Sequence, residues 1–205
     1  TLILTLFPYT TLFRSEHVLT GTERMKQRPI KILVDALRSL GADIQYVGEE
    51  GFPPLRIKGK RLTGGSIEVA GNVSSQYVSA LLMIGPTLEK GLELKLLGNV
   101  ISRPYIDLTL NVMHEYGADA EWTDIDTITI RPKRYEERSY TIENDWTSAS
   151  YWYAILTLLN DRKSYIRFTG LKNGSRQGDS AIKYIFSLLG VKTCFADKEM
   201  DELTD

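Results

Sequence analysis

An internal repeat constrains the fold of this chain more than any other feature. The stretch "GSIEVAGNVSSQYVSALLM" at 65–83 has a counterpart in "RSYTIENDWTSASYWYAIL" at 138–156. Each reads as a strand, a short turn and an apolar helix whose first residues carry hydroxyl groups. Three pairs of residues share an offset of 73 positions (148 − 75): Ser75 with Ser148, Ser102 with Ser175, and Gly117 with Gly190. A common offset and a common order of elements indicate a duplicated unit.

Each copy of the repeat is expected to run strand, helix, strand, helix, strand, with a glycine turn after its second helix. The motif "YGAD" at 116–119 recurs as "LGAD" at 40–43, which indicates an earlier, partly preserved copy. The pattern predicts an α/β fold of repeated βαβαββ units, with helices packed against sheets. The polar, basic segment 131–139 is the expected boundary between a partial first domain, 16–141, and a partial second domain, 142–205.

Hydrophobic periodicity and turn residues place the individual elements. Helices are predicted at about 29–40, 75–84, 104–116, 148–159 and 180–189. Strands are predicted after the turn at Gly41 and at 55–59, 66–71, 92–98, 127–132, 139–144, 164–171 and 191–196. Pro29 suits the first position of its helix, and Gly41 suits the position just after that helix ends.

Composition excludes several classes of protein. With 42% hydrophobic and 25% charged residues, the 205-residue chain reads as soluble and globular. A formal net charge of −1 argues against a nucleic-acid surface, and no apolar run approaches the ~20 residues of a membrane span. Cys194 is the single cysteine, and only two histidines are present, so neither a disulfide nor a metal cluster is expected. We expect a monomer in the reducing cytoplasm, without nucleic-acid or membrane partners.

The first fifteen residues, "TLILTLFPYTTLFRS", fit neither a secretory signal nor the rest of the pattern. The run from Thr5 to Ser15 reads as the translation of a common short-read sequencing adapter. We therefore expect 1–15 to be a non-native segment, and the protein sequence proper to begin at Glu16.

Two predicted helix starts that carry serine residues form the most informative candidate binding site. In the first complete repeat, "NVSSQ" at 72–76 and "NVISRPY" at 99–105 both lead into predicted helices. If the repeats superpose, Ser74, Ser75 and Ser102 converge at one edge of a domain with two positive helix ends and form an anion site. The alternative is that the serines only cap their helices, by accepting hydrogen bonds from backbone N–H groups.

A basic segment, "TERMKQRPI" at 22–30, precedes the helix predicted at 29–40. The guanidinium of Arg28 beside a helix start suits bidentate binding of a phosphate or a carboxylate. The alternative is a solvated basic turn that Arg28 shares with Arg24 and Lys26.

Five ordered motifs closely resemble the 3-phosphoshikimate 1-carboxyvinyltransferase (EPSP synthase) family. They are "TERMKQRPI" with "LVDALRSLGADI", "GNVSSQYVSALLM", "ISRPYIDLTLNVM", "DWTSASYWYAIL" and "NGSRQGD", and the resemblance runs from about residue 16 to about 198. It implies two domains of βαβαββ units, the inverse α/β barrel, of which this chain holds an incomplete part of each.

The resemblance also implies a chemistry. Members of this family, the target of glyphosate, transfer the enolpyruvyl group of phosphoenolpyruvate to the 5-hydroxyl of shikimate 3-phosphate, in the sixth step of the shikimate pathway to chorismate and aromatic amino acids. They use no metal and no organic cofactor. The motifs also imply roles for single residues. Ser74, Ser75 and Gln76 would bind shikimate 3-phosphate, and Gln76 would also touch phosphoenolpyruvate. Ser102 would bind the phosphate, Tyr105 would line the shikimate pocket, and Arg28 would bind phosphoenolpyruvate.

Other family motifs, including the aspartate that acts as general base, have no counterpart in this chain. We therefore expect an internal fragment of the enzyme that is inactive by itself and contains no catalytic residue. Two alternatives stay open. UDP-N-acetylglucosamine enolpyruvyl transferase shares the fold and the reaction type, although its loop cysteine has no match here. The other alternative is a non-catalytic phosphate-binding protein of the same fold.

Overall fold

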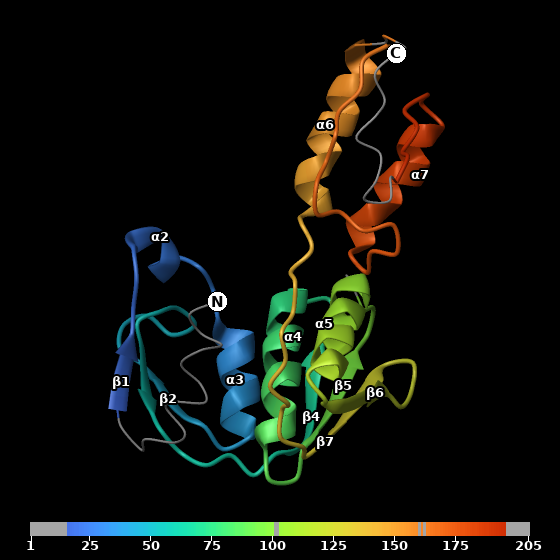
Figure 1. Ribbon diagram of the computed structural model, residues 1–205. Helices are drawn as coiled ribbons and strands as arrows, with labels where there is room; N and C mark the ends of the chain where they lie inside the picture. The colour runs from blue at the N-terminus through green and yellow to red at the C-terminus, as the bar shows by residue number, and fades with distance from the viewer. Residues whose placement is uncertain (1–15, 101–102, 160, 162, 196–205) are drawn as a thin grey trace. The chain divides into compact units, whose positions relative to one another are not determined.

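The computed structural model describes residues 16–100, 103–159, 161 and 163–195. These residues divide after Arg138 into two compact modules, a first module of 16–138 and a second module of 139–195 (Figure 1). The assignment of these modules to domains of 16–141 and 142–205 stays a prediction. The predicted non-native segment, 1–15, lies outside the described residues.

A complete βαβαββ unit forms the second half of the first module. Its elements are β4 (Gly65–Ala70), α4 (Ser75–Ile84), β5 (Leu92–Leu97), α5 (Arg103–Glu115), β6 (Asp119–Trp122) and β7 (Thr127–Arg131), with a short 3-10 turn, η1 (Gly85–Thr87), after α4. The strands form one sheet in the order β4-β5-β7-β6, in which β4 and β5 are parallel and the other neighbours are antiparallel. One copy of the predicted unit is thus present in its full βαβαββ form.

The first half of the module repeats the last part of this unit. It contains β1 (Glu16–Leu19), α2 (Glu23–Lys26), α3 (Lys31–Ser39), β2 (Asp43–Tyr46) and β3 (Leu55–Lys58). The sheet order β1-β3-β2 is antiparallel throughout and corresponds to β5-β7-β6 of the complete unit. Asp43 pairs with Lys58 in the same way that Asp119 pairs with Arg131. The earlier copy predicted from "LGAD" is therefore present, although β1 and α2 were not predicted.

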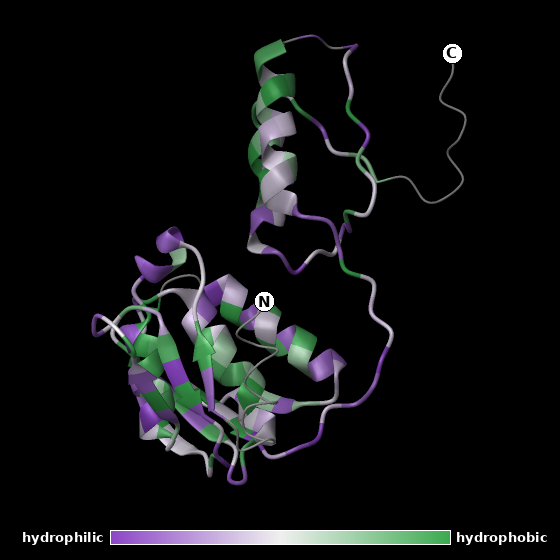
Figure 2. Cartoon of the chain, turned by 90° about the vertical axis from the view of Figure 1, so that its left-hand side faces the viewer, coloured by the Kyte–Doolittle hydropathy of each residue, from purple (hydrophilic) through white to green (hydrophobic). Residues whose placement is uncertain are grey.

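The core lies between the sheets and the three longer helices of the first module. Figure 2 shows the alternation of hydrophobic and hydrophilic residues along the strands that this packing requires. Leu92, Leu94 and Leu96 of β5 are at most 2% exposed, and Leu81 and Leu82 of α4 are fully buried. Burial of one such side chain stabilises the fold by about 1.5–3 kcal/mol.

The C-terminal end of α3 agrees with the sequence prediction, and its N-terminal end does not. Gly41 follows the helix with a φ of 96°, a left-handed conformation that favours glycine, so the predicted C-terminus is confirmed. The predicted role of Pro29 as first helical residue is wrong, because α3 begins at Lys31. The N–H of Ile30 donates instead to the carbonyl of Gly51 at 2.8 Å, which holds the residues before the helix outside it.

The second module contains α6 (Trp146–Leu159), the 3-10 turn η2 (Gly178–Ala181) and α7 (Ile182–Ser187). Trp146 and Tyr153 of α6 are buried, and the Tyr153 ring packs against Phe168 and Phe186 with centroids 6.0 and 5.5 Å apart. The strands predicted at 139–144, 164–171 and 191–196 do not form within the described residues. A strand needs a hydrogen-bonded neighbour, and these segments build no ladder with one another there.

No helix in the described ranges is long and apolar enough to cross a membrane.

Candidate ligand-binding site

The start of α4 is built as the sequence predicts. Ser74 is the N-cap residue, and its hydroxyl accepts a hydrogen bond from the N–H of Gln76 at 3.3 Å. Val78, one turn further on, is buried and anchors the helix to the core. Ser74 and Gln76 are exposed, while Ser75 is half-buried. The capping interpretation is therefore confirmed for Ser74, whose hydroxyl is also accessible to a ligand.

The residues that directly follow β4 and β5 lie side by side. The N–H of Gly71, after β4, donates to the carbonyl of Leu97, at the end of β5, at 2.8 Å. A Cβ atom at Gly71 would approach the Asn99 carbonyl oxygen to 3.1 Å, so this position favours glycine. Because β4 and β5 are parallel, both helices begin at the same edge of the sheet, as the sequence analysis predicts.

A hydroxyl pair joins α4 to α5 near those starts. Ser79 Oγ and Thr109 Oγ1 are 2.7 Å apart, and Thr109 Oγ1 also lies 2.9 Å from the carbonyl oxygen of Tyr105. Because the Thr109 proton goes to that carbonyl, Ser79 is the donor in the pair. The pair fixes the two helices in register, so that Tyr105, in the first turn of α5 and 43% exposed, lies at the same end as Ser74.

A second tie brings the segment of Arg28 to this end. The hydroxyl of Tyr77, in the first turn of α4, donates to the carbonyl of Pro29 at 2.5 Å. Arg28 itself is exposed, and its side chain makes no hydrogen bond or ion pair within the described part of the chain. A guanidinium that is not held by a protein partner is available to an anion.

Five of the six predicted site residues are therefore carried by elements that meet at one end of the first module. The sixth, Ser102, lies outside the described residues. The first turns of α4 and α5 contain no acidic residue, so the positive ends of both helices are not neutralised locally. That arrangement favours an anionic ligand.

The equivalent helix start in the second module carries its own anion. One oxygen of Asp145 accepts from the N–H of Thr147 at 3.0 Å, and the other accepts from the hydroxyl of Ser148 at 2.7 Å. These hydrogen bonds, that from Ser148 foremost, lower the pKa of Asp145. Since a carboxylate already occupies the start of α6, the two copies of the repeat have diverged in what they can bind.

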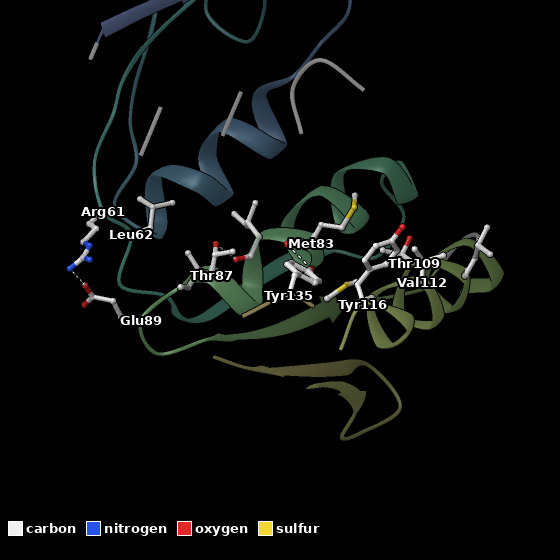
Figure 3. Close-up of a pocket in the computed structure, with 13 residues that line it drawn as sticks. Arg61, Leu62, Met83, Thr87, Glu89, Thr109, Val112, Tyr116 and Tyr135 are labelled. Carbon is white, nitrogen blue, oxygen red and sulfur yellow. Dashed lines mark hydrogen bonds and ion pairs between the residues drawn. The ribbon is translucent and has the colours of Figure 1, made fainter. Parts of the chain in front are cut away.

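A large cavity of the first module is lined by none of the described site residues that the sequence predicts. It has a volume of about 860 Å³ and is lined toward the C-terminal ends of α4 and α5 by residues that include Met83, Val112, Tyr116 and Tyr135 (Figure 3). Arg61, the cation in its lining, is paired with Glu89 at 3.6 Å. A largely apolar lining with a paired cation does not suit a phosphorylated ligand, so the cavity is not the candidate site.

Sequence reasoning missed three side chains beside the candidate site. Arg103, the first residue of α5, stacks on Trp122, which in turn donates to Asp107. Arg28 and Arg103 each stand in an Arg-Pro pair next to a helix, but the same pair at 131–132 ends a strand, so it was only a weak signal. Among the described residues, no group of three or more His, Cys, Asp or Glu side chains is placed to hold a metal ion.

Comparisons with known proteins give one consistent result. The family model described as EPSP synthase (3-phosphoshikimate 1-carboxyvinyltransferase) matches residues 3–203. The 3-phosphoshikimate 1-carboxyvinyltransferase of Bacteroides fragilis (strain YCH46) is 55% identical over 181 residues, which are 88% of this chain and 44% of that protein. The protein of the same name from Histophilus somni (strain 2336) is 40% identical over 185 residues, 89% of this chain and 42% of that protein. The chain thus spans less than half the length of these relatives.

Solved structures show the same fold. An EPSP synthase from Acinetobacter baumannii superposes with a TM-score of 0.58 at 22% identity, over 73% of this chain and 33% of that one. The enolpyruvyl transferase NikO from Streptomyces tendae gives a TM-score of 0.54 at 20% identity, over 73% of this chain and 35% of that one. From the family match over nearly the whole sequence, this chain belongs to the EPSP synthase (3-phosphoshikimate 1-carboxyvinyltransferase) family.

Proposed function

We propose that this chain supplies the shikimate 3-phosphate-binding part of an enzyme that transfers the enolpyruvyl group of phosphoenolpyruvate to the 5-hydroxyl of shikimate 3-phosphate. The observation that carries the proposal is the meeting of two helix starts and the Arg28 segment at one end of the first module. Two hydrogen bonds, Tyr77 to Pro29 and Ser79 to Thr109, support this arrangement. The names of the relatives favour this reaction over the nucleotide-sugar alternative.

Each site residue has a role in this proposal. The hydroxyls of Ser74 and Ser75 and the amide of Gln76 bind shikimate 3-phosphate at the positive end of α4, where the phosphate replaces water as partner of the backbone N–H groups. Ser102 adds a further hydroxyl, and the Tyr105 ring lines the pocket for the shikimate ring. These donors offset the repulsion between two anionic substrates.

Arg28 completes the proposed site. Its guanidinium binds phosphoenolpyruvate, and Gln76 touches both substrates. Geometry that brings two anions together lowers the barrier mainly by orientation, because the reacting groups no longer have to meet by diffusion. The reaction needs no organic cofactor and no metal in this proposal. We further propose a cytoplasmic monomer whose partners are the two small-molecule substrates.

Calorimetric titration of the 205-residue chain with shikimate 3-phosphate tests the proposal. We expect saturable binding that weakens in Ser75→Ala by about 10- to 100-fold, the effect of losing a hydrogen bond to a charged oxygen. Ser148→Ala is the matched control, since Ser148 occupies the equivalent position of the other repeat. Absence of binding by a folded sample would contradict the proposal.

Two further titrations separate the alternatives. Binding of UDP-N-acetylglucosamine in preference to shikimate 3-phosphate would favour the related transferase. Equal binding of inorganic phosphate and shikimate 3-phosphate would favour a non-catalytic phosphate-binding protein. The same sample, given both substrates, is expected to release no phosphate above background, because the family's general base has no counterpart in this sequence.

A further inference from the structure

Three side chains form a clamp at the first turn of α5. The Cζ atom of Arg103 lies 3.9 Å from the centre of the Trp122 ring, a close cation–π contact. A guanidinium N–H of Arg103 also donates to the carbonyl of Ile125 at 3.0 Å. The indole N–H of Trp122 donates to Asp107 Oδ1 at 2.8 Å. Arg103 and Asp107 are four positions apart and therefore share one face of α5.

The clamp joins the helix start to the β6–β7 hairpin. Trp122 is the last residue of β6, and Ile125 lies in the turn that follows. All three clamp side chains are half-buried. The Trp122–Asp107 hydrogen bond is part-buried and therefore less screened by water than an exposed contact, whereas the hydrogen bond from Arg103 to Ile125 is exposed.

Arg28, before α3, and Arg103, at the start of α5, differ in how their side chains are held. The side chain of Arg28, before α3, has no hydrogen bond or ion pair within the described residues, whereas that of Arg103 is engaged on Trp122 and Ile125. An arginine held in this way does not extend to a ligand. Its effect on the site passes through the backbone of the first turn, which carries Tyr105.

We propose that Arg103 is a positioning residue: held on Trp122, it fixes the first turn of α5 and so places Tyr105 for shikimate 3-phosphate. This inference rests on the proposed function, because it concerns the same site. The alternative is that Arg103 binds the phosphate directly, and the two roles predict different effects on ligand binding when Trp122 is removed. A positioning role needs the indole ring, whereas a direct ligand is set free when the ring is removed.

The test is a double-mutant cycle on the full 205-residue chain, with shikimate 3-phosphate titrated calorimetrically. We expect Arg103→Met and Trp122→Leu each to weaken binding by about three- to tenfold, and the double variant by no more than either alone. Unchanged or tighter binding by Trp122→Leu would overturn the inference, and so would additive losses. Arg131→Met is the matched charge control, because Arg131 pairs with Asp119 and Glu121 on the same hairpin.

Conservative variants guard against simple loss of structure. Asp107→Asn keeps an oxygen to accept from the indole N–H and is expected to bind like the wild type, whereas Asp107→Leu is expected to weaken binding. Trp122→Phe keeps a ring under the guanidinium, so we expect it to bind more nearly like the wild type than Trp122→Leu does. If Trp122→Leu does not fold, Arg103→Met and the two Asp107 variants carry the test. Equal losses in Asp107→Asn and Asp107→Leu would contradict the clamp.

A spectroscopic readout separates failure of this inference from failure of the proposed function. The indole N–H resonance of Trp122, assigned by its disappearance in Trp122→Phe, and amide exchange in the first turn of α5 report on the clamp without ligand. If the wild type does not bind shikimate 3-phosphate, the proposed function fails and the positioning role fails with it, whatever the amides show. If the wild type binds but amide exchange in Arg103→Met matches the wild type, only the clamp is overturned.

Discussion

The hydroxyl of Tyr77 and the carbonyl of Pro29 are 2.5 Å apart, and this hydrogen bond ties the segment of Arg28 to the first turn of α4. The two residues belong to different copies of the repeat and are 48 positions apart in the sequence. One side chain therefore connects the start of α4 to the residue that follows Arg28, the arginine that we propose as a ligand of phosphoenolpyruvate.

Replacement of Tyr77 by phenylalanine removes this hydrogen bond and keeps the ring. We expect the free energy of unfolding of the first module to fall by about 0.5–1.5 kcal/mol, the net value of one intramolecular hydrogen bond. Urea denaturation at neutral pH measures the loss. Tyr151→Phe is the control, since Tyr151 is 70% exposed in the other module. An equal change in both variants would show that the bond contributes nothing specific.

Substitution of Ser74 by aspartate separates capping from ligand binding. Aspartate is as good an N-cap as serine, so Ser74→Asp should unfold within about 0.5 kcal/mol of the wild type. Its negative charge repels a phosphate at the same helix end, so binding of shikimate 3-phosphate should be lost. Asp145 gives the precedent, because it caps α6 in this way.

The two properties are measured on one sample, by urea denaturation and by calorimetric titration. Ser74→Ala is the complementary variant: it lacks the cap and should lose about 1 kcal/mol of stability, with a smaller effect on binding than the aspartate. Retention of wild-type affinity in Ser74→Asp would place the phosphate elsewhere.

The sequence predicts an element well when the residues that determine it lie close together in the chain. The bounds predicted for α4, 75–84, coincide with the observed helix, because an apolar face and a serine cap lie within the same stretch. The common edge of the α4 and α5 starts also follows from the repeat. By contrast, a strand depends on a partner that the local pattern does not reveal, and the strand predicted at 164–171 is wrong. The roles of Tyr77 and Arg103 depend on Pro29 and Trp122, which periodicity does not bring together.

Glu143 makes the stability of the second module depend on pH in the acidic range. Its carboxylate accepts from the N–H of Lys172 at 2.8 Å, the indole of Trp146 at 2.9 Å and the hydroxyl of Ser175 at 2.8 Å. Burial raises the pKa of Glu143, but these donors outweigh it, so that the pKa lies below its usual 4.5. The stabilisation is thus fully present above pH 4.5 and is lost as pH falls through the lower pKa of the folded state.

Replacement of Glu143 by glutamine should remove this acid dependence. The variant keeps an acceptor but loses the charge, so we expect it to be about 1–2 kcal/mol less stable at neutral pH. The difference from the wild type should shrink as pH falls below 4.5. Urea denaturation between pH 3 and pH 7, followed by near-ultraviolet circular dichroism, measures both effects. A constant difference over that range would contradict the role of the charge.

Tyr135 makes the stability of the first module depend on pH in the alkaline range. Its hydroxyl donates to the carbonyl of Met83 at 2.9 Å, and burial raises the pKa of Tyr135 to about 12, from its usual 10.0. Below pH 10 the phenol is neutral in both states and the stabilisation is complete. As pH rises from 10 toward 12, the unfolded chain releases the proton and the folded chain keeps it, so unfolding becomes easier by up to about 1.4 kcal/mol per pH unit.

Tyr135→Phe isolates this contribution. At neutral pH the variant should be less stable by about 0.5–1.5 kcal/mol, because the Met83 carbonyl loses its donor. Above pH 10 the wild type should lose stability faster than the variant, so that their curves converge or cross. The other tyrosines and the lysines are common to both proteins and cancel in the difference. Parallel curves from pH 8 to pH 11.5 would mean that the Tyr135 phenol titrates equally in the folded and unfolded states, and that burial does not protect it.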